Sequence, residues 1–240
     1  MKKIAKAIAT IMLMTATVCT VGCKKVDDSN NGSGNGGHYD HEYVDLGLPS
    51  GTLWATCNVG ANTSEEIGDY FAWGETTTKT IYNWATYTHC KGSRKKLTRY
   101  CNEPNYGYNE FTDNIKVLLS SDDAATVNWG VNWQTPTSKQ WKELIDNTTA
   151  VIWFTPSGVN GWLFTASNGQ NLFLPATGYH WGDDLEEVVN GYYWSSSLYT
   201  LHPSAAWYFF FNSSDFKMKY DRARGNGFPI RPVVRPTSQD

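Results

Sequence analysis

The sequence predicts an α+β domain, and three observations support this fold class. Short apolar or aromatic runs alternate with Gly, Asn, Pro and Ser from Tyr43 to about Pro236, which is typical of many short strands joined by ordered loops. Residues 137–147 carry the signals of an amphipathic helix, and a second helix is expected around 121–129. Two helices among many strands, without alternating β-α-β units, favour α+β over a parallel α/β sheet.

Turn residues between the apolar runs mark the expected strands. The stretch "YVDLGLPSGTLWATCNVGA" predicts a strand, a Gly-Leu-Pro-Ser-Gly turn and a second strand from Thr52 to Asn58. The stretch "GWLFTASNGQNLFLPA" predicts a hairpin that reverses at residues 167–170. Asn190-Gly191 marks another turn, directly before Tyr192.

The better specified helix is expected to begin at Thr137. Thr137 and Gln140 have the spacing of a capping box, in which the two residues satisfy each other's free backbone amides. Three apolar residues then fall on one face of the helix: Trp141, Leu144 and Ile145.

For the second helix, Ser120 or Ser121 is the expected N-cap. Asp122 and Asp123 follow, and carboxylates favour the positive end of the helix dipole. Both signals place the start of this helix just after residue 121.

Composition excludes some partners and leaves others open. The formal net charge is -3, so nothing in the overall balance indicates a nucleic-acid partner, and none is expected. Aromatic residues make up 15% of the chain, with 11 Trp and 14 Tyr, and such rings serve both cores and recognition surfaces. Roughly 200 residues remain beyond the amino-terminal segment, enough for one self-sufficient core.

The amino-terminal segment, residues 1–22, has the pattern of an export signal. It has a basic start, a short apolar run and small residues before Cys23. Val21-Gly22-Cys23 resembles the cleavage box of a bacterial lipoprotein, which implies that Cys23 carries acyl chains that anchor the protein to a membrane. An ordinary secretory peptide cut nearby is the alternative. The acidic residues Asp27 and Asp28 resemble the surface-export tag of Bacteroidetes lipoproteins, so an exposed position on the outer membrane is expected.

Residues 23–42 are expected to form the lipidated cysteine and a flexible tether. The run "SNNGSGNGG" at 29–37 lacks the apolar surface that would offset the entropy of ordering. A single folded domain is expected over residues 43–235, followed by a tail at 236–240.

Six blocks of this domain occur in an order that resembles a known family. They are "YVDLGLPSGTLWATCNVGA", "GDYFAWGE", "DDAATVNWGVNWQTPTSKQW", "LFLPATGY", "GYYWSSS" and "RGNGFPIRPV". This order resembles the Fibrobacter succinogenes major paralogous domain family over residues 43–235, with Gln134-Thr135 as a departure from its usual pattern. The resemblance implies a C-type lectin-like fold, with two helices packed on a small twisted antiparallel sheet and long loops on one side.

The resemblance also divides the carboxyl-terminal region into scaffold and binding face. The residues that it implies as scaffold are Trp194, Ala205, Phe209, Phe211, Gly225, Ile230 and Pro232. The residues that it implies as candidates for ligand binding are Tyr193, Tyr199, His202, Trp207, Tyr208, Asn212, Asp215 and Tyr220. For each Tyr and Trp among these candidates, packing in a core is the alternative.

The cysteines fit an exported protein. Cys90 and Cys101 flank a loop rich in Lys and Arg and are the candidate disulfide. Cys57 lies among apolar neighbours and is expected to be a buried, inert thiol. No cysteine follows Cys101, which argues against the thiol chemistry of formylglycine-generating enzymes, a group related in fold.

No metal site and no cofactor are expected. The tripeptide Glu103–Asn105 matches a signature of calcium lectins but precedes both expected helices, so calcium is not supported. The acidic residues at 183–187 and the basic residues at 91–99 are expected to be solvated loops. His38 and His41 supply only two imidazoles, fewer than a structural zinc site needs.

The favoured function is a non-catalytic lipoprotein on the cell surface that binds a glycan or protein through its aromatic carboxyl-terminal face. One alternative is an envelope enzyme acting on polysaccharide, whose candidate carboxylates are Glu75, Glu110, Asp113 and Asp183. The other alternative is a passive structural or fimbrial component, which an exposed apolar patch or open strand edge would favour.

Overall fold

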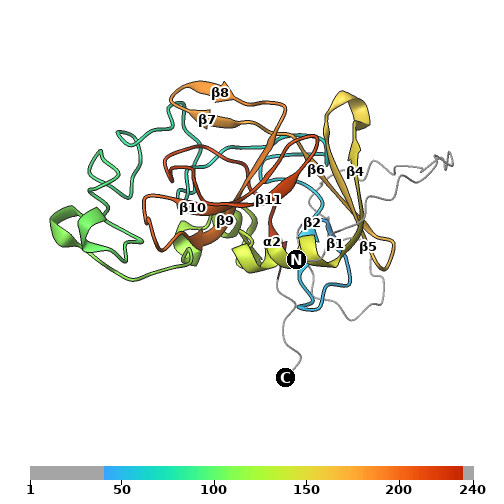
Figure 1. Cartoon of the computed structure of the whole chain (residues 1–240), viewed down its shortest axis with the longest axis horizontal. Coiled ribbons are helices and arrows are strands. Elements are labelled where there is room, and N and C mark those ends of the chain that lie inside the picture. Colours follow the sequence, from blue (N-terminus) through green and yellow to red (C-terminus); the bar gives the residue numbers. More distant parts are fainter. Residues whose placement is uncertain (1–40, 235–240) are drawn as a thin grey trace.

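The computed structural model describes residues 41–234 as an α+β domain, which confirms the predicted fold class. Within these residues, small antiparallel sheets and two α-helices are joined by long loops (Figure 1). The expected signal segment, the lipidated Cys23, nearly all of the tether and the tail lie outside the described residues. No helix between residues 41 and 234 is both long and apolar enough to span a bilayer.

One sheet joins the two ends of the domain. Its order is β1-β2-β12-β3, and it comprises β1 (Tyr43–Asp45), β2 (Leu53–Ala55), β3 (Trp133–Gln134) and β12 (Val233–Val234). The expected strand at 52–58 is therefore shorter than its sequence pattern. Val233 pairs with Trp54 on one side and with Gln134 on the other, so the carboxyl-terminal strand is central.

Three further sheets complete the domain. The sheet in the middle of Figure 1 has the order β11-β10-β9 and comprises β9 (Gly191–Leu198), β10 (Ala206–Phe211) and β11 (Phe216–Lys219). A second comprises β4 (Thr148–Phe154), β5 (Gly161–Ala166) and β6 (Asn171–Pro175). A small hairpin comprises β7 (Tyr179–Trp181) and β8 (Asp184–Glu186). The predicted reversal at residues 167–170 connects β5 to β6 and is confirmed.

The helix expected at Thr137 is α2 (Ser138–Asn147), and its capping box is present. The Thr137 amide donates to Gln140 Oε1 over 2.9 Å, and the Gln140 amide donates to Thr137 Oγ1 over 3.2 Å. Trp141 and Leu144 are buried, as the apolar face predicts. Four short 3₁₀ turns also occur in the described chain, at η1 (Pro104–Tyr106), η2 (Tyr108–Glu110), η3 (Ser120–Asp122) and η4 (Pro156–Gly158).

The second helix, α1 (Ala124–Trp129), begins later than expected. Its N-cap is Asp123, whose carboxylate accepts from the amides of Ala125 and Thr126. Ser120 and Ser121 lie in the preceding η3 turn, so their predicted capping role is wrong. The Asp123 carboxylate also accepts hydrogen bonds from the backbone amide and the hydroxyl of Thr135. These bonds hold Asp123 at the start of the helix and connect the helix to the residue that follows β3.

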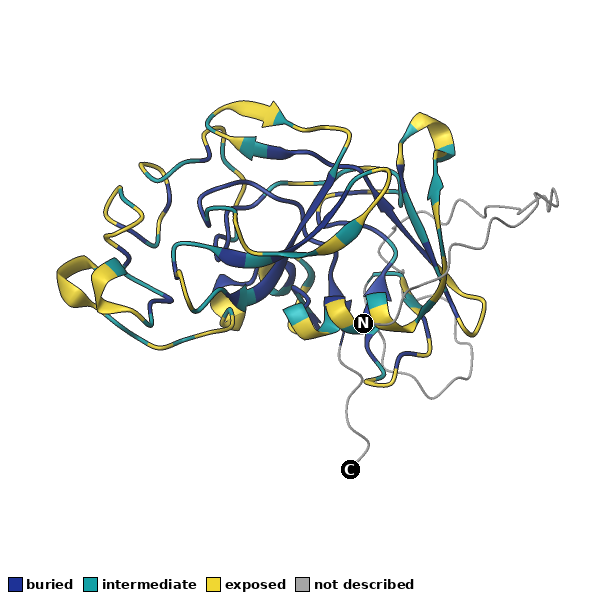
Figure 2. Ribbon diagram, viewed as in Figure 1, coloured by how far each residue is buried: buried dark blue, intermediate teal, exposed yellow. Residues whose placement is uncertain are grey.

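The β9–β11 sheet is covered on both faces. One face belongs to a core cluster that includes Tyr192, Trp194, Tyr208 and Phe210. The opposite face belongs to a second cluster that includes Tyr193, Phe209 and Phe211. Side chains alternate between the faces of a strand, so a sheet packed on both sides buries consecutive residues. Figure 2 accordingly shows β9 and β10 almost entirely in the colour of buried residues.

This packing corrects two of the predicted binding residues. Tyr193 and Tyr208 are wholly buried. The Tyr193 hydroxyl donates to the Pro175 carbonyl over 2.7 Å, and the Tyr208 hydroxyl donates to the Asp221 carboxylate. Alternation along the strand could place only one of the two faces toward a ligand, and the structure covers both.

The predicted scaffold residues are interior, with one exception. Trp194, Phe209, Phe211 and Ile230 belong to the two core clusters, and Gly225 and Pro232 are buried. Ala205, just before β10, is only half-buried.

Two fully buried arginines explain the polar character of "RGNGFPIRPV". Arg224 donates to the carbonyls of Tyr100 and Arg99 over 2.9 and 3.2 Å, which fixes the loop before η1 against the carboxyl-terminal segment. Arg231 donates to Asn58 and to carbonyls at the end of β2. Burial lowers the pKa of Arg231 to about 10.

The expected disulfide between Cys90 and Cys101 is wrong. Both cysteines are free and buried, and both belong to an apolar cluster with Leu97. Their thiols donate to backbone carbonyls instead, Cys90 to Trp84 over 3.2 Å and Cys101 to residue 103 over 3.2 Å. Cys57 is fully buried, as predicted.

Candidate functional site

Three aromatic rings gather at one end of the β9–β11 sheet. The ring of Tyr199 stacks on that of Tyr220, with centroids 4.0 Å apart and an interplanar angle of 18°. The Trp207 ring meets both edge-on, with centroid distances of 5.5 Å to Tyr199 and 5.1 Å to Tyr220. We call these three residues the ring cluster.

Strand pairing explains why the three rings meet. β10 is antiparallel to both β9 and β11, so the start of β10 lies beside the ends of its two neighbours. Tyr199 directly follows β9, Trp207 lies near the start of β10, and Tyr220 directly follows β11. Residues far apart in the sequence therefore lie together at one end of the sheet.

An irregularity in pairing turns Trp207 outward. The register between β10 and β9 shifts between Ala206 and Tyr208, and the Trp207 carbonyl accepts from the Ser195 hydroxyl over 2.9 Å. Such bulges redirect a side chain locally. Trp207 is thus the one residue of β10 that is not fully buried.

The ring cluster is accessible and uncharged. Tyr220 exposes 44% of its surface, while Tyr199 and Trp207 are half-buried. Partial burial and the neighbouring Tyr220 phenol raise the pKa of Tyr199, so its hydroxyl stays protonated at neutral pH. The cluster therefore offers ring faces and neutral hydroxyl groups.

His202 connects the ring cluster to a residue that sequence reasoning missed. The His202 ring lies 5.8 Å from that of Tyr199, and its Nδ1 shares a hydrogen bond of 3.0 Å with the hydroxyl of Tyr106. Tyr106 ends η1, almost a hundred residues earlier in the chain. Its only signal in the sequence is the aromatic stretch "NYGYNEF" among polar residues.

The remaining predicted binding residues, Asn212 and Asp215, lie elsewhere. They form the turn between β10 and β11, where Asn212 Oδ1 accepts from the amides of Ser214 and Asp215. Asp215 pairs with the exposed Lys217 over 2.8 Å. Asn212 is five positions beyond Trp207 along the extended chain, roughly 16 Å at the usual rise. The structure brings together four of the eight candidates: Tyr199, His202, Trp207 and Tyr220.

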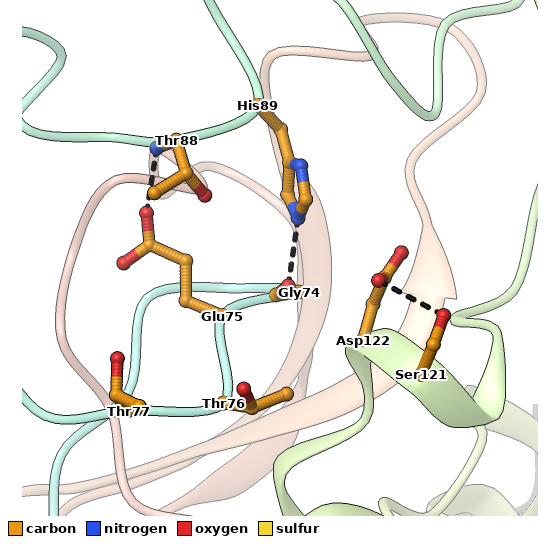
Figure 3. A pocket seen from close by; sticks show the side chains of 8 residues that line it. All are labelled: Gly74, Glu75, Thr76, Thr77, Thr88, His89, Ser121 and Asp122. Atoms are coloured by element: carbon orange, nitrogen blue, oxygen red, sulfur yellow. Dashed lines mark hydrogen bonds between the residues drawn. The ribbon is translucent and has the colours of Figure 1, made fainter.

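A polar pocket of about 190 Å³ is a second candidate site (Figure 3). Its lining residues come from three loops: Gly74, Glu75, Thr76, Thr77, Thr88, His89, Ser121 and Asp122. His89 Nε2 lies 2.7 Å from the Gly74 carbonyl, so Nε2 carries the hydrogen. Burial lowers the pKa of His89, which keeps the ring neutral at neutral pH.

Both carboxylates of this pocket have partners that balance their charge. Glu75 pairs with Lys79 over 2.6 Å and also accepts from the Thr88 amide. Asp122 pairs with Arg99 over 2.5 Å and accepts from the Tyr100 hydroxyl. The pocket can therefore offer hydroxyl, imidazole and carboxylate groups without a large net charge.

The other candidate carboxylates do not join Glu75. Asp113 accepts from the amides of Tyr100 and Cys101 and holds the loop between them. Glu110 and Asp183 are exposed, in η2 and in the β7–β8 turn. The carboxylate that lines the same pocket as Glu75 is Asp122, which the sequence suggested only as a helix-terminus residue.

The charged segments of the sequence lie mainly at the surface. The residues expected to form a solvated acidic loop build the β7–β8 hairpin, where Glu187 binds Arg222 over 2.9 Å. Four exposed apolar side chains accompany these acids: Trp181, Leu185, Val188 and Val189. Of the basic residues at 91–99, Lys91, Arg94, Lys95 and Lys96 are exposed, as predicted, whereas Arg99 is half-buried and pairs with Asp122.

The metal-binding motifs of the sequence do not assemble into a cluster. Between residues 41 and 234, no group of three His, Cys, Asp or Glu side chains is close enough to hold a metal ion. Glu103–Asn105 is exposed at the start of η1. The ring of His41 stacks on Trp129 at 3.8 Å, and His38 lies outside the described residues.

Comparisons with protein-family models, curated proteins and solved structures found no match for this chain.

Proposed function

We propose that the protein is a lipoprotein of the outer membrane whose folded head binds a glycan or protein at the cell surface through the ring cluster. One observation carries this proposal: Tyr199, Trp207 and Tyr220 are packed together at an accessible end of the β9–β11 sheet. Large rigid rings supply contact area at little conformational cost, and such side chains dominate binding energies.

The proposal includes a C-type lectin-like fold for the folded head. A C-type lectin-like fold and membership of the Fibrobacter succinogenes major paralogous domain family remain predictions from the six ordered sequence blocks. The described helices and small antiparallel sheets are compatible with that fold. A solved crystal structure that superposes on lectin-like domains would support the assignment, and a different strand connectivity would refute it.

A binding array tests the proposed recognition. The full chain, purified in detergent, is applied to an array of glycans and host-surface proteins beside the variant Tyr220→Ala. Since 44% of the Tyr220 surface is exposed, the variant should fold, and binding should fall about tenfold, equivalent to about 1.4 kcal/mol. Trp181→Ala is the matched control, because it removes an exposed ring on β7, outside the ring cluster. Binding that survives Tyr220→Ala, or no binding at all, refutes the proposal.

The membrane anchor is tested separately. Cys23→Ser should prevent incorporation of labelled palmitate and release the protein from the membrane fraction, because acylation at Cys23 is the expected attachment. Intact cells expressing the original chain should lose the head to added protease. Label that persists in the variant, or a head that is protected in intact cells, contradicts the proposed attachment or location.

The polar pocket favours a second candidate function, hydrolysis of an envelope polysaccharide. Glu75 and Asp122 line one cavity, and glycoside hydrolases use two carboxylates. Release of reducing ends from polysaccharide by the full chain should then be abolished by Glu75→Gln and by Asp122→Asn. Activity unchanged in both variants, or no activity in the original chain, rules this candidate out.

A further inference from the structure

Beyond the ring cluster, the aromatic surface continues into the loop that carries η1. The centroid of His202 lies 5.8 Å from that of Tyr199 and 6.2 Å from that of Tyr106. Ring contacts therefore run without a break from the ring cluster of Trp207, Tyr220 and Tyr199 through His202 to Tyr106. We call these five residues the ring row.

Hydrogen bonds hold the Tyr106 end of the ring row against the segment that carries Tyr199 and His202. Asn102 Nδ2 donates to the Thr200 carbonyl over 2.8 Å, and the Tyr106 hydroxyl contacts His202 Nδ1. Arg224 fixes the preceding residues through two carbonyls. The loop of Tyr106 is therefore docked on the segment that follows β9. A ligand that touches both ends meets a surface that is already ordered, which reduces the entropy cost of binding.

The chemistry of the ring row favours a neutral ligand rich in hydroxyl groups. It contains no Lys, Arg, Asp or Glu side chain, so it presents no fixed charge of those kinds to an ionic ligand. Tyrosine hydroxyls and the imidazole can donate or accept hydrogen bonds. The C–H face of a pyranose packs on an aromatic ring, while its rim of hydroxyls reaches such polar groups.

The shape and size of the ring row favour a chain over a single sugar or a folded protein. The ring cluster lies at one end and Tyr106 at the other, and His202 connects them, so a ligand of several units can meet rings at both ends. A stable protein interface involves about 20–30 residues on each side, whereas the ring row has five. We propose that the ring row binds an extended chain of neutral sugars, with Tyr106 serving a separate subsite from the ring cluster.

This inference rests on the proposed function of the ring cluster and makes a distinct prediction about ligand length. Short oligosaccharides can occupy only the ring cluster, so their affinity should not depend on Tyr106. Longer chains reach His202 and Tyr106, so they should bind more tightly and should lose that gain in Tyr106→Ala. Tyr220→Ala should weaken every length.

The experiment uses the full chain and ladders of neutral gluco-, manno-, galacto- and N-acetylglucosamine oligosaccharides, from the monosaccharide to the hexasaccharide. Affinity is measured by calorimetry for the original chain and for three variants. Tyr106→Ala should bind the hexasaccharide about tenfold more weakly and the disaccharide unchanged. Tyr108→Ala is the matched control, since Tyr108 is a neighbouring exposed tyrosine outside the ring row. Thermal unfolding shows that each variant is folded.

The outcomes separate this inference from the proposed function. If Tyr106→Ala binds the hexasaccharide as tightly as the original chain while Tyr220→Ala is impaired, the inference is overturned and the proposed function stands. The same holds if no ladder binds but an arrayed glycan or protein binds in a manner that depends on Tyr220. If no ladder, arrayed glycan or arrayed protein depends on Tyr220, both proposals are overturned.

Discussion

Trp207 and Tyr208 are neighbours in β10, yet they belong to different regions of the molecule. Tyr208 is wholly buried among the rings of the sheet interior, and its hydroxyl is bonded to Asp221. Trp207 lies at one end of the sheet, where it contacts Tyr199 and Tyr220. The two regions contain the same types of residue, so residue type alone does not separate them.

Position in the sheet decides what an aromatic residue does here. Between the ends of β9 and β10, both faces are covered and rings serve the core. At the end of the sheet near Trp207, the strands pair irregularly and then stop, which leaves the ring cluster accessible. Interior rings should therefore control the stability of the fold, and the rings of the ring cluster should control binding.

The largest expected effect is on the interior. Phe209 is fully buried and stacks on Trp141 of α2, with centroids 4.7 Å apart. Phe209→Ala should lower the free energy of unfolding by about 3–5 kcal/mol, because it removes buried area and leaves a cavity. Urea denaturation measures the change, and Phe209→Leu should lose much less. A loss below about 1 kcal/mol for Phe209→Ala would show that the β10 interior is loosely packed and would break the comparison.

Alkaline pH should weaken the interior next. Burial, followed by hydrogen bonds to carboxylates, raises the pKa of Tyr100 and Tyr179 to about 12. Burial also raises the pKa of Tyr193 and Tyr208. A tyrosine with a raised folded-state pKa adds stability that is complete below pH 10 and is lost as the pH rises through the folded-state value. Arg231, with its pKa lowered to about 10, has the opposite effect in the same range, but it is one group against several.

Denaturation at a series of pH values, with tyrosinate absorbance recorded in parallel, tests this expectation. Stability should fall above pH 10, and the buried tyrosines should ionise together with unfolding. If all tyrosines ionise near pH 10 while the chain stays folded, solvent reaches the rings that we place in the interior.

The smallest expected effect on stability is in the ring cluster. Tyr220→Ala should lower the free energy of unfolding by only about 0.5–1 kcal/mol, because it removes ring contacts with Tyr199 and Trp207 from a side chain that is 44% exposed. The same urea experiment measures it beside Phe209→Ala. Equal losses in the two variants would mean that the ring cluster is part of the core, and the basis for a binding role would disappear.

Some of the candidate site could be predicted from the sequence. The resemblance placed Tyr199, His202, Trp207 and Tyr220 on one face, and the structure brings these four together. It also placed Tyr193 and Tyr208 there, because a single strand pattern does not show whether a sheet is covered on one face or on two. Tyr106 could not be found, since its contact with His202 depends on how a long loop docks.

By itself, the sequence determined the features that depend on near neighbours along the chain. The capping box of α2, the β5–β6 reversal and the α+β class follow from hydrogen bonds and turn preferences that span a few residues. Only the tertiary structure decided which tyrosines are buried, that Cys90 and Cys101 remain free, and that Arg224 holds the loop before η1. Burial and long-range hydrogen bonds arise when distant segments pack together, and no short window of sequence contains both partners.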